Sequence, residues 1–306
     1  MAPDSQAALR LVLAGPPSNP ERGGSLAGVG TPLGSFIRAK RDSTQPHALG
    51  LPDHGRRRSP GLRRLDLATR AGISVEYLTR IEQGRDRNPS PEVVDALADA
   101  LCLDAAERNH LRYLAKITGD ECTVQIRPVP PTRRVRPSAL RTLHLLEPGV
   151  AMIGNRLGDV LAHTDAFRSV ATGTGLLDAP HPNLNHYAFT DPRSRSFFVD
   201  WDDIADELAF DLWRAPSLEN LEWLTAGLTP VAGEDFTRRL NRHVVPRRGV
   251  LRLNHPSGHH LRLHRETFEL AEDAQQLVVF LPADDRTAEA VDHLHRRSHG
   301  GLRSIS

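Results

Sequence analysis

Residues 61–87 constrain the fold of this chain most, because they contain two short amphipathic segments separated by a tight turn. Apolar residues recur at helical spacing on both sides of Gly72, which interrupts the pattern. These apolar positions are Leu67, Ala68, Ala71, Val75, Leu78 and Ile81. Ser74 can cap the second helix by accepting a hydrogen bond from a first-turn amide, and Gly84 can close it in a left-handed conformation. The pattern is typical of a helix-turn-helix.

Three further helices are predicted around this motif. An apolar stripe predicts a helix over residues 32–42. Ser90, followed by proline and glutamate, is a typical helix start, and Asp104 with Glu107 three residues later forms a capping-box pattern. The five helices together predict a compact all-α domain over residues 32–117.

Charge is divided unevenly along the chain, although the net charge is only +1. Residues 33–117 hold 15 Arg and Lys against 11 Asp and Glu, whereas residues 118–306 hold 22 against 25. A basic first part favours a polyanionic partner, because bound phosphates release condensed counterions. The acidic second part indicates a different kind of partner.

The segments outside the first domain differ in composition. Residues 1–31 are rich in Gly, Pro and Ser and poor in large apolar groups, so we expect them to be disordered. Residues 118–137 contain four prolines and read as a linker. Residues 138–285 form the second domain, and residues 286–306 are expected to add one helix and a polar tail.

The second domain mixes strand and helix patterns and therefore predicts an α+β fold. The apolar LVVF run within Gln276–Leu281 suits a central strand. The other predicted strands are Val150–Ile153, Asp159–Ala162, Val250–Leu253 and His260–His264. One helix is predicted to start near Thr164, and three further helical stretches are Asn183–Leu212, Leu218–Leu228 and Asp235–His243.

With these motifs the chain resembles helix-turn-helix regulators of the XRE class that carry a C-terminal MmyB-like ligand-binding domain. The first domain contributes LGSFIRAKR, PGLRR, AGISVEYLTRIEQGR and NPSPEVVDALADAL. The second contributes FTDPRSRSFFVDW, FTRRLNRHVV and QQLVVF. The resemblance covers roughly residues 33–285.

The resemblance implies an all-α five-helix DNA-binding domain followed by an α+β PAS-like domain that binds a small apolar ligand such as a fatty acid. The implied function is sequence-specific regulation of transcription in response to that ligand. The chain departs from the family pattern at His186, Leu240, Val244 and Arg265. These departures leave open whether the cavity keeps the family's ligand.

A helix-turn-helix inserts its second helix into the major groove, which predicts the residues that read DNA. The predicted base readers are Ser74, Glu76, Tyr77 and Arg80. The predicted phosphate contacts are Arg64, Arg85, Arg56, Arg57 and Arg58. Glu82 would repel phosphate, and the resemblance implies instead that it forms a structural ion pair with Arg41.

Candidate ligand contacts in the second domain are large apolar side chains, a type of residue that more often forms ordinary core. They are Met152, Phe167, Phe189, Phe198, Trp201 and Leu212. Asp191, Arg195 and Asp200 are expected to form a polar network, either structural or as anchors for a ligand head group.

No motif of an enzyme, of a metal site or of a bound cofactor is recognised in the sequence. Cys102 and Cys122 are too few for a zinc site or a disulfide scaffold, and no apolar run reaches the length of a membrane span, so we expect a cytoplasmic protein without a membrane partner. Operator symmetry favours a homodimer, although no heptad pattern marks an interface. The alternative function is a module whose helical domain binds a protein rather than double-stranded DNA.

Overall fold

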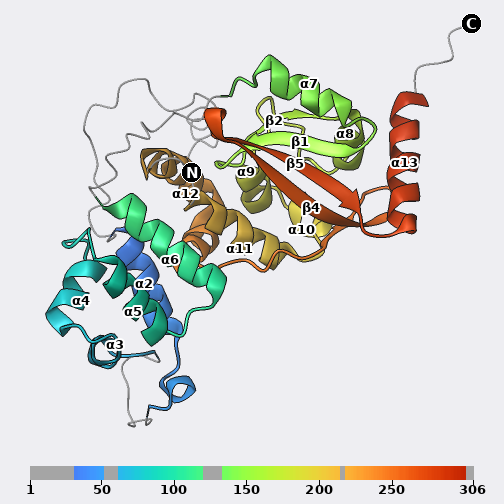
Figure 1. The fold of residues 1–306 in the computed structure, drawn as a ribbon. Helices are drawn as coiled ribbons and strands as arrows, with labels where there is room; N and C mark the ends of the chain where they lie inside the picture. The colour runs from blue at the N-terminus through green and yellow to red at the C-terminus, as the bar shows by residue number, and fades with distance from the viewer. Residues whose placement is uncertain (1–30, 52–60, 120–132, 214–217, 301–306) are drawn as a thin grey trace, which may run out of the picture. The chain divides into compact units, whose positions relative to one another are not determined.

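The structure is a computed structural model that describes residues 31–51, 61–119, 133–213 and 218–300. These residues form two compact units, shown in Figure 1 with the labels used below. Residues 31–119 with Leu240–Val245 make up the N-terminal unit, and residues 133–239 with 246–300 make up the C-terminal unit. The predicted disordered segment up to residue 30, the arginines Arg56, Arg57 and Arg58, and most of the predicted linker lie outside the described residues.

All five helices predicted for the N-terminal unit are present. They are α2 (Pro32–Ser43), α3 (Arg64–Arg70), α4 (Val75–Glu82), α5 (Pro91–Ala100) and α6 (Ala105–Thr118), with a short 3-10 helix η1 (Pro46–Leu49) after α2. The predicted caps form: Ser74 Oγ accepts from the Tyr77 amide at 3.0 Å, and Asp104 and Glu107 cap each other's backbone amides. Local polar signals therefore set where these helices begin.

Two glycines shape the N-terminal unit. A Cβ on Gly34 would lie 2.6 Å from the carbonyl oxygens of Ile81 and Glu82, so α2 and α4 approach each other at a point where only glycine fits. Gly84 has φ +70°, the left-handed conformation that the sequence predicts after α4. The core between the helices is apolar and closed, with Phe36, Leu67, Leu78, Ile81 and Leu111 fully buried.

The C-terminal unit is built on a five-stranded antiparallel sheet in the order β2-β1-β5-β4-β3. Its strands are β1 (Val150–Asn155), β2 (Val160–His163), β3 (Leu251–Asn254), β4 (His260–Leu270) and β5 (Gln275–Pro282). The LVVF strand β5 is central, as predicted. An α+β fold is therefore confirmed for this unit.

Strand β1 is buried on both faces, because its side chains alternate between two cores. Val150 and Met152 join the large core, whereas Ala151 and Ile153 join a smaller one with Leu143. Leu143 belongs to α7 (Pro137–Leu145), which covers that second face in Figure 1. Helix α7 was not predicted from the sequence, since it is only nine residues long and follows a proline-rich stretch.

Five of the described helices contribute side chains to the large core on the other face of the sheet: α8 (Asp165–Ala171), α9 (Leu184–Thr190), α10 (Arg193–Phe197), α11 (Trp201–Leu212) and α13 (Asp285–Gly300). The chain between α11 and β3 forms α12 (Leu218–Arg242). Thr164 caps α8 as predicted, and α12 is interrupted at Gly233, which separates the two helices predicted there. Among the described helices, none is long and apolar enough to cross a lipid bilayer.

Candidate functional site

The first candidate site is the outward face of α4 in the N-terminal unit. Leu78, Ile81 and Glu82 are buried, whereas the cap residue Ser74, Glu76 and Arg80 are exposed. Tyr77 is half-buried, and the Arg80 guanidinium lies 5.4 Å from the centre of its ring. Burial and the nearby Asp86 raise the pKa of Tyr77, so its phenol is neutral. The four predicted base readers therefore lie together at the start and on one side of a helix.

Glu82, on the opposite side of α4, is a buried brace. Its carboxylate is fully buried and accepts hydrogen bonds from Arg41 Nε and Arg64 Nε, each at 2.7 Å. The predicted ion pair with Arg41 is confirmed. Arg38 adds a hydrogen bond to the Glu82 carbonyl oxygen at 3.3 Å, so α2, α3 and α4 meet at this one residue.

The arginines predicted to contact phosphate have different surroundings. The side chain of Arg64 is 42% exposed although its Nε is bound to Glu82, so the brace positions this guanidinium at the surface. Arg85, just after α4, is exposed.

The second candidate site is a cavity of about 300 Å³ inside the C-terminal unit. The pocket-facing residues of β1, β5 and β4 form its floor, while α8, α9 and α11 contribute its walls. Apolar side chains dominate the lining, which is typical of a ligand cavity. Of the predicted contacts, Met152, Phe167 and Phe198 line the cavity. Phe189, Trp201 and Leu212 lie in or beside the core, and among the described residues they are not part of the lining.

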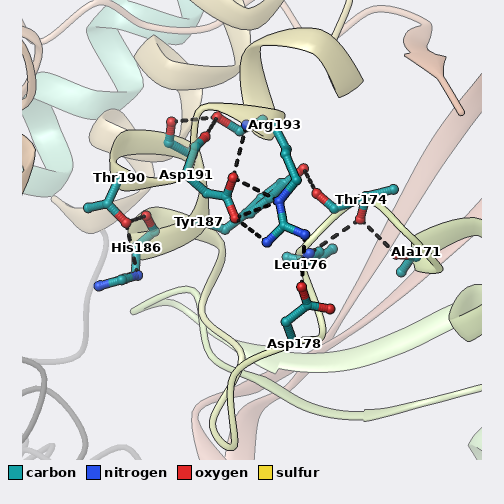
Figure 2. A network of polar contacts seen from close by, with 11 residues as sticks. Ala171, Thr174, Leu176, Asp178, His186, Tyr187, Thr190, Asp191 and Arg193 are labelled. Atoms are coloured by element: carbon teal, nitrogen blue, oxygen red, sulfur yellow. Dashed lines mark hydrogen bonds and ion pairs between the residues drawn. The ribbon is translucent and has the colours of Figure 1, made fainter. Parts of the chain in front are cut away.

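A charged clamp holds the wall between α8 and α9 (Figure 2). The Arg193 guanidinium donates to Asp191 at 2.7 Å and to Asp178 at 2.9 Å. Hydrogen bonds from Arg193 lower the pKa of Asp191, which therefore stays ionised. Gly175 lies directly under the guanidinium, where a Cβ would come within 2.4 Å of it. The clamp fixes the loop that carries the cavity residue Leu176.

A neutral chain of hydrogen bonds supports the same loop (Figure 2). The Tyr187 hydroxyl donates to the Thr174 carbonyl at 2.9 Å, and Thr174 Oγ1 donates to the carbonyl of Ala171 at 2.7 Å. Burial raises the pKa of Tyr187 to about 12, so the hydroxyl remains a donor at any physiological pH. Neither Tyr187 nor Thr174 was predicted from the sequence, because both side chains bond to backbone carbonyls, and any residue type can supply a backbone carbonyl.

The predicted network of Asp191, Arg195 and Asp200 is wrong as a set. Asp191 pairs with Arg193, and Asp200 pairs with Arg252 on β3 at 2.7 Å. Arg195 lies over the indole of Trp201, 3.6 Å from the ring centre. Arg193 and Arg195 both lie on the short helix α10, but they contact different partners, which sequence spacing alone does not reveal.

Comparison with known families identifies both units. The family described as helix-turn-helix domain matches residues 33–111. The family described as MmyB-like transcription regulator ligand binding domain matches residues 135–294, more than half of the chain. The chain belongs to the MmyB-like transcription regulators. No curated protein matches this MmyB-like regulator.

Both matched domains of the MmyB-like regulator are regulatory ones, one for binding DNA and one for binding a ligand. The fold expected from the resemblance is confirmed for both units. In the parts of the chain that the structure describes, no three His, Cys, Asp or Glu side chains are grouped so that they could hold a metal ion.

Proposed function

We propose that this DNA-binding regulator reads base edges with the outward face of α4 and changes its DNA affinity when a small, mainly apolar molecule occupies the C-terminal cavity. The observation that carries the first half is the separation of faces on α4: Leu78 and Ile81 are buried, while Glu76 and Arg80 are exposed. A helix with a buried apolar side and an exposed polar side can enter the major groove without losing its core.

Each exposed side chain has a chemical role open to it in the groove. Glu76 can accept from a cytosine amine, Tyr77 can contact a thymine methyl or a phosphate, and Arg80 can donate two hydrogen bonds to guanine or bind the backbone. Ser74 lies at the start of α4, where its hydroxyl can bind a base edge. Arg64 and Arg85 are proposed phosphate contacts, and so are Arg56, Arg57 and Arg58.

Arg80→Ala tests the reading role. We expect it to weaken binding to DNA from the protein's own upstream region by about 1–3 kcal/mol while affecting scrambled DNA much less. Arg112→Ala is the matched control, because Arg112 is also exposed but lies on α6. Both variants remove one positive charge, so the control isolates electrostatics. Equal losses of affinity for specific and scrambled DNA would mean that Arg80 contacts phosphate and not a base.

The proposed ligand is of fatty-acid size and mostly apolar. Support comes from a cavity of about 300 Å³ whose lining is dominated by side chains such as Met152, Phe167 and Val278. A ligand shifts DNA affinity only if it binds one conformation of the protein better than another. The absence of enzymatic activity and a homodimeric state remain parts of this proposal.

N-Phenyl-1-naphthylamine, an uncharged apolar fluorophore, tests whether the cavity takes an apolar guest. We expect its fluorescence to rise on binding the full-length protein and the rise to disappear in Val278→Trp, because the indole would occupy the middle of the cavity floor. Far-UV circular dichroism of the variant controls for folding. An unchanged signal in a folded Val278→Trp protein would place the fluorophore outside the cavity.

The alternative function is a helical domain that binds a protein. Leu65 on α3 is 61% exposed and is the feature that would suit such a partner. DNA binding through phosphates weakens steeply as salt rises, so titrations at several salt concentrations separate the two functions. Binding without salt dependence or sequence preference would favour the alternative.

A further inference from the structure

Three rows of side chains cross the floor of the cavity. Antiparallel pairing places one residue each from β1, β5 and β4 in a row, and residues two apart on a strand share a face. The rows are Val150, Phe280 and Arg265; then Met152, Val278 and Thr267; then Gly154, Gln276 and Glu269. All of these residues except Glu269 line the cavity. The first and third rows are four residues apart along each strand, which corresponds to roughly 13 Å.

The first row ends in a cluster of two arginines and two carboxylates. Arg265 Nη2 donates to Glu207 at 2.6 Å, Arg248 Nε lies 3.1 Å from the other Glu207 oxygen, and Arg248 Nη2 donates to Asp211 at 2.6 Å. All four side chains line the cavity, and their charges sum to zero. Arg265 Nε is buried and has no hydrogen-bond partner among the described residues. This end of the cavity therefore holds a donor that needs an acceptor.

The other end of the cavity, near the third row, holds a buried acceptor that needs a donor. Asn185 lines the cavity, is 1% exposed, and uses its Nδ2 to donate to the Leu157 carbonyl at 3.0 Å. Gly158 lies against it, since a Cβ there would come within 2.5 Å of Asn185 Nδ2. Asn185 Oδ1 is buried, and no described group donates a hydrogen bond to it. A buried acceptor without a donor is destabilising unless a ligand supplies one.

We propose that the ligand is an uncharged aliphatic molecule with a polar group at each end, one accepting from Arg265 Nε and the other donating to Asn185 Oδ1. This inference rests on the proposed function of the cavity and specifies its ligand. A carboxylate end is disfavoured, because it would bring a third anion beside Glu207 and Asp211, whose charges already neutralise both arginines. A hydroxyl or a carbonyl satisfies Arg265 without adding charge.

Chain length follows from the spacing of the rows. In an extended chain each bond of about 1.5 Å advances about 1.25 Å, so ten carbons with an oxygen at each end place the two oxygens roughly 13 Å apart. A suitable probe is 1,10-decanediol, since each hydroxyl can both donate and accept. 1-Decanol has one such group, and decanoate has a carboxylate in its place, with a methyl group at the other end of both molecules.

The experiment is displacement of N-phenyl-1-naphthylamine from the full-length protein by these three compounds. We expect 1,10-decanediol to bind about fivefold to tenfold more tightly than 1-decanol, as one added buried hydrogen bond provides. We expect decanoate to bind more weakly than 1-decanol, because it places an anion where 1-decanol has a hydroxyl. Decanoate binding as tightly as the diol would overturn the inference and leave the proposed function standing. Failure of the fluorophore and all three compounds to bind would overturn both.

Two variants locate the two ends. Asn185→Leu and Arg265→Met should each reduce the preference for diol over 1-decanol to less than about twofold. Each variant replaces a side chain that would bond to one end of the diol by an apolar side chain. Met152→Leu, a volume-conserving change in the second row, is the control and should shift all three compounds alike. A diol preference that survives in both variants would overturn the inference. If a variant does not fold, the order of affinities of the three compounds for the wild-type protein still tests the inference.

Discussion

Replacing Glu82 by Gln should destabilise the N-terminal unit strongly, although it changes few atoms. The carboxylate is fully buried and binds Arg41 Nε and Arg64 Nε at 2.7 Å each. Breaking a buried ion pair costs about 3–5 kcal/mol, because the remaining charge is left without its partner. Arg41 keeps Asp42, 2.7 Å away, and the Leu62 carbonyl, 2.9 Å away, so we expect the lower end, about 3 kcal/mol.

The assay uses the distribution of tryptophans. All three tryptophans follow residue 200, so their fluorescence reports the C-terminal unit, while far-UV circular dichroism reports the helices of both units. A loss of about 3 kcal/mol lowers the melting temperature of a domain this size by about 12–24 °C. We expect this shift in an early circular dichroism transition and no matching shift in tryptophan fluorescence.

Two further variants decide between a brace and a general effect of losing charge. Asp95→Asn removes one partner of the exposed Arg112–Asp95 pair and should cost less than about 1 kcal/mol. Arg41→Met combined with Glu82→Leu should be milder than Glu82→Gln, because replacing both buried partners leaves neither charge uncompensated. A shift for Glu82→Gln no larger than for Asp95→Asn would refute the reasoning.

Three other predictions concern packing, pH and the cavity. Gly34→Ala should lower the melting transition of the N-terminal unit by several degrees, because its Cβ would meet α4 backbone carbonyls at 2.6 Å, and an unchanged transition would refute that close approach. Burial, with His110 and Lys40 nearby, lowers the pKa of His243 to about 3. The unfolded chain then binds a proton below pH about 6.5 that the folded protein does not, so stability present above that pH is lost progressively toward pH 3. Melting curves against pH should show this slope in the wild type and a shallower one in His243→Phe, whereas equal slopes would contradict the assignment. Val278→Trp should keep DNA affinity in the absence of ligand while abolishing fluorophore binding, as measured by fluorescence anisotropy of labelled DNA, and a loss of both would indicate misfolding rather than a filled cavity.

Local signals explain which parts of the fold the sequence predicted. Caps such as Ser74 and Asp104 satisfy amides within their own helix, so their effect is readable from neighbouring residues. The central strand β5 was also readable, because its LVVF run is continuous. The sequence predicted β4 only as far as His264, whereas the strand continues to Leu270 through mostly exposed residues. Pairing with β5, and not apolar content, extends it.

The candidate sites also differ in how far the sequence could predict them. The predicted base readers on α4 follow from helical periodicity within one element, and the Arg41–Glu82 pair follows from the class resemblance. The cavity is different, because Asn185 on α9 and Arg265 on β4 are 80 positions apart in the sequence and only the tertiary fold brings them to the same cavity. Sequence identified Met152, Phe167 and Phe198 as large apolar residues, but it could not separate them from core residues such as Trp201.

Coupling between the cavity and DNA is the central claim, and one titration tests it most directly. The affinity of the full-length protein for its own upstream DNA is measured with and without saturating N-phenyl-1-naphthylamine, and the affinity for the fluorophore with and without that DNA. Thermodynamic linkage requires the two factors to be equal, and we expect a change of about fivefold or more. Identical DNA affinities with the cavity empty and filled would contradict the account.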